Sequence, residues 1–320
     1  MSQKSKGKSK AKPKPTMSAT FSGSGLRVLA PAKLNLSLEI TGKRGDGYHK
    51  IDTVMTTLDL ADRVTLHPAS ELSVTLSGEF ARGIDAADDL SGRAARALAE
   101  AAEREPDVAI AVKKNIPSPA GLGGGSSDAA AVLRGLNRLW NLGWSTERLA
   151  DVGATVGSDV PFFVHGGTAH CTGRGEIVEP LRDLTPGRAL VLLPPVPIAA
   201  GKTARLYGAL HSHDFTDGDR PQRLARRIAR GAPPPTNDLV NAFEKVVERT
   251  EPELVAHYAM YSGAGAPRLH LCGAGPAVYL WVREAAKTSE LRRDFEQVGA
   301  TVFEVRTLSR EESLAMEDLA

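Results

Sequence analysis

Residues 119–128, PAGLGGGSSD, place four glycines within five positions. The apolar run at 108–112 predicts a short strand before them, and an apolar stripe at 127–141 predicts an amphipathic helix after them. Glycines let backbone N–H groups approach a ligand closely, and a helix start carries a partial positive charge. The stretch therefore predicts a phosphate-binding loop at a strand-to-helix junction, with the hydroxyls of Ser126 and Ser127 available to phosphate oxygens or Mg²⁺.

The same glycine-rich stretch could also be an ordinary turn or part of a better-known nucleotide motif. An ordinary turn in which Ser127 caps the helix stays open, although such a turn needs fewer glycines. A P-loop of the pattern G-x-x-x-x-G-K-[ST] would use Gly201-Lys202-Thr203, but the position of its first glycine holds Val196. A dinucleotide-binding G-x-G-x-x-G would place its last glycine at Ser126 or Asp128. We therefore expect a phosphate loop that belongs to neither of these two folds.

Outward from the loop, predicted strands and helices alternate along the chain. Residues 33–40 alternate apolar and polar side chains, which predicts a strand with one buried face. Residues 220–236, which contain GAPPP, are expected to form a loop. We expect further strands at 51–60, 63–68, 72–76, 108–112, 162–165, 190–194, 269–272, 277–282 and 301–305, and helices at 91–105, 127–141, 145–156, 202–210, 238–258 and in the charged segment before 301. This mixture predicts an α+β protein.

Two charged residues could carry chemistry beside the loop. Asp159 lies in the turn Gly157-Ser-Asp-Val-Pro161, where an aspartate most often caps a helix or forms an Asx turn, and where it could instead serve as a general base. Lys33 lies on the polar face of the strand at 33–40, so it is either an exposed strand lysine or a charge clamp for phosphate. The catalytic hypothesis is therefore that Asp159 acts as the general base and that Lys33 acts with it as the charge clamp for phosphate.

Two further glycine turns could face a ligand. In GDGYH, residues 45–49, Tyr48 can stack on a planar ring and His49 can hydrogen-bond its edge, although an ordinary hairpin turn is equally consistent. The segment CGAGP at 272–276 predicts either a tight connection between strands or a backbone wall behind phosphates.

Composition and charge narrow the class of protein. With 320 residues, 42% hydrophobic and 24% charged, the chain matches an average globular protein, which excludes whole-chain disorder and a collagen-like repeat. The formal net charge of +2 divides unevenly, because the first fifteen residues hold six lysines and no acidic residue, leaving 34 basic and 38 acidic residues, or −4. We expect residues 1–25 to be a disordered basic tail, solubilising or weakly attracted to anionic surfaces, on a mildly acidic body.

The cysteines and apolar runs bear on the compartment. Cys171 and Cys272 lie about a hundred residues apart, which predicts neither a disulfide framework nor a C-x-x-C metal site. No apolar run reaches the roughly 18 residues of a spanning helix, and the N-terminus lacks the apolar stretch of a signal peptide. We expect a cytoplasmic protein without a membrane or nucleic-acid partner, present as a monomer or weak homodimer.

Five segments together resemble the GHMP small-molecule kinases, in the order found in that family. They are PAKLNLSLEITGKRGDGYHKIDTVM (31–55), IPSPAGLGGGSSDAAAVLRGLNRLW (116–140), GSDVPFFVHGGTAHCTGRGE (157–176), NDL (237–239) and CGAGPAVYLW (272–281). The resemblance covers roughly residues 27–310. It implies an ATP-binding domain at 26–175 that carries the glycine loop, a ferredoxin-like α+β domain at 176–312, and an active site in the cleft between them.

The resemblance also implies an activity. DGYH, together with PAKLNL and GSDVPFF, is typical of the members that transfer the γ-phosphoryl group of ATP, with Mg²⁺, to the 2-hydroxyl of a cytidine diphosphate-linked methylerythritol in isoprenoid synthesis. In this family Asp159 matches the catalytic base and Lys33 its partner. The nucleotide would contact Pro119, Ala120, Gly121, Leu122, Gly123, Gly124, Gly125, Ser126, Ser127, Lys114 and Asp89, and the acceptor Asn35, Tyr48, His49, Thr203 and Tyr207. No metal ligand from the protein is implied, so that ATP and water would hold Mg²⁺.

Departures from the family pattern leave alternatives open. Cys272 and Ala274 stand where relatives usually carry hydroxyl residues, and Asp89 stands where they carry Asn, so it can accept from the amino group of adenine but cannot donate. The alternatives are a GHMP kinase acting on mevalonate, homoserine or a sugar, a non-catalytic nucleotide sensor, and a nucleic-acid-binding protein that uses the tail. The DGYH turn, as a stacking surface for cytosine, would have no use with mevalonate, homoserine or a sugar as acceptor. The presence of both Lys33 and Asp159 argues against a non-catalytic sensor.

Overall fold

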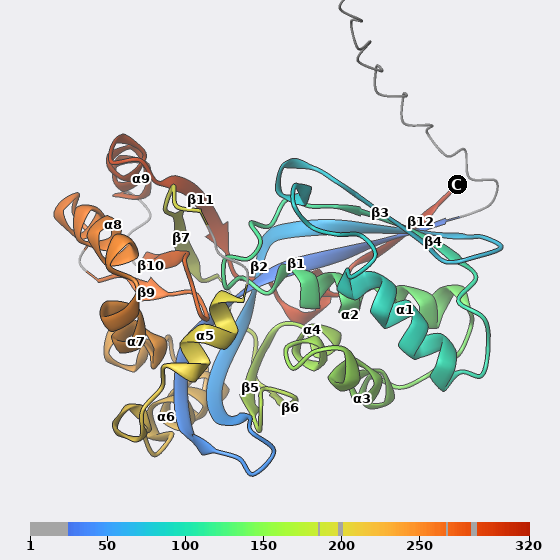
Figure 1. Ribbon diagram of the computed structural model, residues 1–320, viewed down its shortest axis with the longest axis horizontal. Coiled ribbons are helices and arrows are strands. Elements are labelled where there is room, and N and C mark those ends of the chain that lie inside the picture. The colour runs from blue at the N-terminus through green and yellow to red at the C-terminus, as the bar shows by residue number, and fades with distance from the viewer. Residues whose placement is uncertain (1–24, 185, 198–200, 267, 283–286) are drawn as a thin grey trace, which may run out of the picture.

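The computed structural model describes residues 25–184, 186–197, 201–266, 268–282 and 287–320, so the predicted tail, apart from Gly25, lies outside the described residues. Within those ranges the strands form an eight-stranded and a four-stranded sheet, which lie in opposite halves of the molecule (Figure 1). The first sheet has the path β12-β1-β2-β4-β3, with β5 paired to β2, β6 to β5 and β8 to β1. Its strands are β1 (Gly25–Lys43), β2 (His49–Pro68), β3 (Ser73–Ser77), β4 (Val108–Lys113), β5 (Thr168–Thr172), β6 (Ile177–Pro180), β8 (Val240–Asn241) and β12 (Met316–Leu319).

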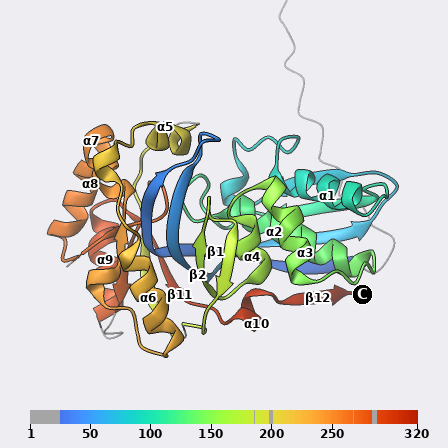
Figure 2. The same ribbon diagram turned by 90° about the horizontal axis from the view of Figure 1, so that it is seen from below.

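The first sheet is built around one long hairpin. Strands β1 and β2, of 19 and 20 residues, pair antiparallel over almost their whole length and extend from the first half of the molecule toward the second (Figures 1 and 2). The prediction of a strand with one buried face at 33–40 was half right. The strand is present, but its polar residues Lys33, Asn35, Ser37 and Glu39 are buried as well, because other parts of the chain cover both faces.

Four helices cover one side of the first sheet. They are α1 (Leu90–Ala101), α2 (Gly124–Leu139), α3 (Thr146–Val156) and α4 (Val160–His165). The buried face of α2 carries alanines, Val132, Leu133 and Leu136, which join Val28, Val64 and other sheet residues in one core. Burial of this apolar stripe fixes α2, and with it the glycine loop that precedes it.

The second sheet has the order β11-β7-β10-β9 and carries its own core of aliphatic and aromatic side chains. Its strands are β7 (Arg188–Leu193), β9 (His270–Leu271), β10 (Val278–Val282) and β11 (Thr301–Arg306). The helices of this half are α5 (Lys202–Gly208), α6 (Asp219–Ala229), α7 (Phe243–Thr250), α8 (Pro252–Gly263) and α9 (Thr288–Gln297), and the short α10 (Arg310–Ser313) precedes β12. Single 3-10 turns lie at Glu79–Ala81, Ser212–Asp214 and Thr236–Asp238.

Three predictions of secondary structure were wrong. Residues 162–165 are not a strand but belong to α4, since Pro161 sets a helical start and a short apolar run suits either element. Residues 220–236 are not all loop, because Pro221, Leu224, Ala225 and Ile228 form the buried stripe of α6. The helix expected from 238 begins at Phe243, after β8, and a new helix starts at Pro252.

A division of the chain at residue 175 does not separate the two halves cleanly, because strands from beyond that residue pair within the first sheet. Strand β8 pairs in parallel with β1, and β12 returns from the far end of the chain to pair with the start of β1 (Figure 1). The boundaries at 26–175 and 176–312 therefore remain a prediction. Among the described residues, no helix is both long and apolar enough to cross a membrane.

Candidate active site

A cavity of about 940 Å³ lies where segments of both halves meet. The first half contributes residues of β1 and β2, the glycine loop and the turn at 157–159, and the second half contributes α5 and the turn at 272–276. Ten of the predicted site residues line it: Lys33, Asn35, Tyr48, His49, Gly121, Gly123, Ser126, Asp159, Thr203 and Tyr207. The structure thus brings together side chains that lie up to 174 positions apart in the sequence.

The glycine loop depends on a close approach between two backbone segments. Gly121 has φ +82°, and a Cβ placed on it would lie 1.8 Å from the carbonyl oxygen of Cys272. Gly123, with φ +76°, takes the N-cap position of α2, where a Cβ would meet the ring of Phe163. Neither position accommodates a side chain. Besides the left-handed backbone, Gly121 permits the contact with the turn at 272–276, and Gly123 permits the contact with Phe163.

The structure excludes one of the two roles that the sequence left open for Ser127, that of the helix cap. Gly123, not Ser127, occupies the N-cap position of α2, and Ser127 lies in the first turn, fully buried. Its hydroxyl has no hydrogen-bond partner among the described residues. Ser126 is the loop serine that lines the cavity.

Lys33 and Asp159 face each other at the end of the cavity beside the glycine loop. The Lys33 ammonium lies 3.8 Å from Oδ2 of Asp159 and donates to Oδ1 of Asn35, while the Asn35 amide donates to Thr53 Oγ1 at 2.9 Å. Lys33 is 4% exposed, and the Asp159 side chain is 33% exposed. Asp159 precedes α4 but makes no capping hydrogen bond, so its carboxylate has no role as a cap and is available to a ligand.

Aromatic side chains surround the other end of the cavity. The rings of His49 and Tyr207 stack with centroids 5.3 Å apart, and Phe215 and Phe243 meet them edge-on. Burial, together with the charge of Lys43, lowers the pKa of His49, so its imidazole is neutral near pH 7 and offers one donor and one acceptor. This end can therefore hold a flat heterocycle by stacking and by edge hydrogen bonds.

Tyr48 stands at the rim of that aromatic end. Its side chain is exposed, and the guanidinium of Arg174 lies 4.8 Å from the centre of its ring. Arg174 lines the cavity and was not among the predicted site residues. It lies within the segment GSDVPFFVHGGTAHCTGRGE, but an arginine between two glycines carries no chemical signature of its own.

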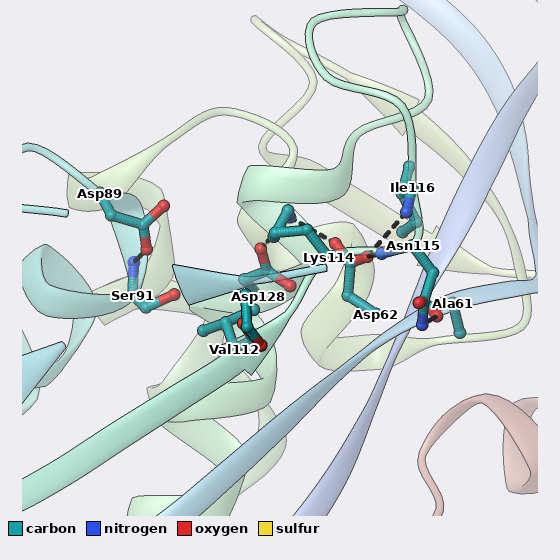
Figure 3. Close-up of polar contacts among 10 residues, drawn as sticks. Ala61, Asp62, Asp89, Ser91, Val112, Lys114, Asn115, Ile116 and Asp128 are labelled. Carbon is teal, nitrogen blue, oxygen red and sulfur yellow. Dashed lines mark hydrogen bonds and ion pairs between the residues drawn. The ribbon is translucent and has the colours of Figure 1, made fainter. Parts of the chain in front are cut away.

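The remaining predicted residues do not line the cavity. Pro119, Ala120, Leu122, Gly124, Gly125 and Ser127 belong to the loop or to the first turn of α2, behind its surface. Asp89 caps α1, its carboxylate accepting from the backbone N–H of Ser91 at 2.9 Å. Lys114 is 1% exposed, and its ammonium contacts the carboxylates of Asp62 and Asp128 instead of the cavity (Figure 3). Neither side chain lines the cavity, and their expected contacts with a nucleotide remain predictions.

Lys202 is a second cationic residue that sequence reasoning did not select. It was noticed only as part of a false P-loop pattern, yet its ammonium is buried and donates to the carbonyl of Ala274 at 2.7 Å. Burial lowers the pKa of Lys202 to about 8. The glycine turn thus has one lysine on each side, because the ideal Cβ of Gly273 would lie 3.2 Å from Lys33 Nζ and that of Gly275 3.1 Å from Lys202 Nζ.

The two cysteines are free and buried, as expected from their spacing. Burial raises the pKa of Cys272 to about 12 and that of Cys171 well above its usual range. Both thiols stay protonated at neutral pH, which argues against a nucleophilic role for either. Among the described residues, no group of three or more His, Cys, Asp or Glu side chains is placed to hold a metal ion.

Comparison with known proteins agrees with this geometry. The family model of the GHMP kinases N terminal domain matches residues 89–167. Proteins named 4-diphosphocytidyl-2-C-methyl-D-erythritol kinase are 39% identical over 285 residues in Dehalococcoides mccartyi and 40% identical over 290 residues in Bacillus cytotoxicus, covering 88% and 90% of this chain and 98% and 99% of the relatives.

Solved structures give the same result. A crystal structure of 4-(cytidine 5'-diphospho)-2C-methyl-D-erythritol kinase matches with a TM-score of 0.70 and 32% identity, over 88% of this chain and 99% of that one. The homoserine kinase from Cytophaga hutchinsonii, with a TM-score of 0.64 over 95% of this chain and 100% of its own, is 12% identical and shares the fold alone. Because the identity to the first group extends over nearly the whole length of its members, the chain belongs to the 4-diphosphocytidyl-2-C-methyl-D-erythritol kinases of the GHMP kinase family.

Proposed function

We propose that the chain transfers the γ-phosphoryl group of ATP to the 2-hydroxyl of 4-diphosphocytidyl-2-C-methyl-D-erythritol, a step in the non-mevalonate synthesis of isoprenoid precursors. One observation carries the proposal: the glycine loop, the pair Lys33–Asp159 and the aromatic residues Tyr48, His49 and Tyr207 line a single cavity. Its volume of about 940 Å³ is at the upper end of ordinary small-molecule sites, as two nucleotide-containing substrates require.

Asp159 is the general base in this proposal. The acceptor hydroxyl is tertiary and a weak nucleophile, so removing its proton as it attacks lowers the barrier. The Asp159 carboxylate faces the cavity without capping α4, and the nearby Lys33 ammonium keeps it oriented. Lys33 is itself held by Asn35, which Thr53 holds in turn, so the charged pair is preorganised before a substrate arrives.

The phosphates meet positive charge from a few placed groups. Phosphoryl transfer needs mainly positioning and neutralisation of charge, because its transition state is loose. The loop backbone at Gly121–Gly123 and the start of α2 supply partial positive charge, and Lys33 supplies a full one. This arrangement explains how a body with a net charge of −4 can bind two polyanions without a broad basic surface.

Mg²⁺ fits the available oxygen donors if it arrives on ATP. Among the described residues, Ser126 supplies a hydroxyl oxygen that lines the cavity at the loop, and magnesium in kinases commonly takes few protein oxygens while phosphates and water fill its other positions. The ion would neutralise charge on the β- and γ-phosphates.

At the aromatic end, the cytidine part of the acceptor would stack on Tyr48 and hydrogen-bond to the neutral imidazole of His49. Tyr207, whose ring stacks on His49, and Thr203, both from α5, would complete the cytidine site. The test is a product analysis by phosphorus NMR with the full chain, ATP, Mg²⁺ and the cytidine diphosphate-linked acceptor. The proposal predicts a new phosphomonoester on the acceptor in equal amount to ADP. ADP formed without the phosphomonoester would show that the chain only hydrolyses ATP. If neither ADP nor the phosphomonoester formed, the proposed kinase activity would be excluded.

A further inference from the structure

A buried cluster of charges lies behind the glycine loop, outside the cavity. Lys114, the residue after β4, places its ammonium between the carboxylates of Asp62 from β2 and Asp128, the fifth residue of α2 (Figure 3). All three side chains are at most 1% exposed. The three residues belong to different elements that meet at the base of the loop.

Asp62 also fastens the backbone that leads into the loop. Its Oδ1 accepts from the backbone N–H groups of Asn115 and Ile116, the latter at 2.8 Å, and the Asn115 side chain donates to the carbonyl of Ala61 at 2.8 Å (Figure 3). The entry to the loop is therefore tied to β2 by three hydrogen bonds, in addition to the ion pair of Lys114.

Asp128 holds the other end of the loop. Its Oδ2 accepts from Lys114, whereas its Oδ1 is buried without a hydrogen-bond partner among the described residues. The carboxylate therefore does not cap its own helix and contacts Lys114 instead. One ammonium thus connects the entry of the loop, through Asp62, with its exit at the start of α2.

A gain in stability alone does not account for this cluster, because burying three charged groups carries a large desolvation cost. It buries one cation with two carboxylates, and burial raises the pKa of Asp128, although Lys114 opposes that effect. Buried ionic groups of this kind are often no better for stability than apolar residues of the same size, and in some proteins they specify a single geometry. A geometric role therefore accounts for the cluster better than a gain in stability does.

We propose that Asp62, Lys114 and Asp128 form a clamp that positions the glycine loop for ATP. The proposal rests on the proposed function, with ATP as the phosphate donor. All three residues act as positioning residues and do not contact a substrate. It replaces the expectation that Lys114 meets the nucleotide directly. The two ideas differ in one consequence: losing Asp128 weakens ATP binding if the residue clamps the loop, but leaves it equal or stronger if Asp128 only competes for a nucleotide-binding Lys114.

The test is calorimetric titration of the full chain with ATP and Mg²⁺, supported by steady-state kinetics. Asp128→Ala should raise the dissociation constant and KM for ATP about tenfold, the loss of one charge-assisted contact, and should leave the acceptor KM within twofold. Asp128→Asn should bind ATP within about twofold of the wild type, because its amide oxygen can still accept from Lys114. Should Asp128→Ala fail to fold, Asp62→Asn serves instead. Its amide oxygen would stay with the N–H groups of Asn115 and Ile116, which leaves its NH₂ group facing the Lys114 ammonium, so the same tenfold loss is expected.

Arg134→Met is the matched control. Arg134 is a buried cation on the same helix, and it donates to the carbonyl of Leu29 at 2.8 Å, away from the loop. It should lower the melting temperature without changing the dissociation constant for ATP. Unchanged ATP binding in Asp128→Ala, or an equal loss in Asp128→Asn or Arg134→Met, would overturn the clamp. A wild-type chain that fails to bind ATP would instead overturn the proposed function.

Discussion

Replacing Gly121 by alanine tests whether the glycine loop works through its contact with the turn at 272–276. The new Cβ would lie 1.8 Å from the carbonyl oxygen of Cys272, so the two segments would have to separate by about 1.2 Å to reach 3.0 Å. A left-handed alanine costs a further ~1–2 kcal/mol of stability, because φ at this position is +82°. Displacements of about 1 Å at a reacting group can cost about 10²-fold in rate, which is the expected loss in kcat/KM.

Gly143→Ala provides the matched control. Gly143 is also left-handed, with φ +65°, but nothing lies within 4 Å of its ideal Cβ. The control should lose the same ~1–2 kcal/mol in a urea unfolding experiment and keep kcat/KM within about twofold. Both variants are to be assayed by coupled ADP release at a temperature where each is fully folded. A kcat/KM for Gly121→Ala close to that of Gly143→Ala would refute the close-approach argument.

Three further predictions address the chemistry, the acceptor and the electrostatics. Asp159→Asn should lose about 10²–10⁴-fold in kcat with the ATP dissociation constant nearly unchanged, as measured by ADP release and calorimetry; near-normal turnover would exclude it as the base. Tyr48→Ala should raise the acceptor KM at least several-fold, a stacking contact being worth about 1 kcal/mol, and an unchanged KM would exclude contact with cytosine. Because the pKa of Lys202 is lowered to about 8 from 10.5, the wild type should gain unfolding free energy relative to Lys202→Met between pH 8 and 10.5, and parallel pH profiles would contradict this.

Local patterns predicted the parts of the fold that local chemistry determines. The glycine loop, α2 and the alternating strand at 33–40 were recognisable because each combines a clear period with a turn or a helix start. The helix α4 was missed because a short apolar run after a proline fits a strand equally well, and α6 was missed because its arginines and the following GAPPP obscure four apolar positions. Pairing over long distances, such as β12 with β1, leaves no trace in a local pattern.

The candidate site shows the same division. Residues with a distinctive setting, such as Asp159 before Pro161 and the GDGYH turn, were found from the sequence and do line the cavity. Lys114 was expected near the nucleotide. In the structure its ammonium pairs with the carboxylates of Asp62 and Asp128, which lie 52 and 14 positions away in the sequence. Lys202 and Arg174 were overlooked because only the folded chain shows that they stand beside the glycine turn and over Tyr48.

The most direct test of the central claim compares acceptors. With ATP and Mg²⁺ held constant, ADP release by the wild-type chain is measured with the cytidine diphosphate-linked methylerythritol and separately with mevalonate, homoserine and galactose. A cavity that recognises cytosine by stacking and by buried hydrogen bonds should favour the first acceptor in kcat/KM by roughly 10³-fold or more. Equal or greater kcat/KM with any of the other three would contradict the account.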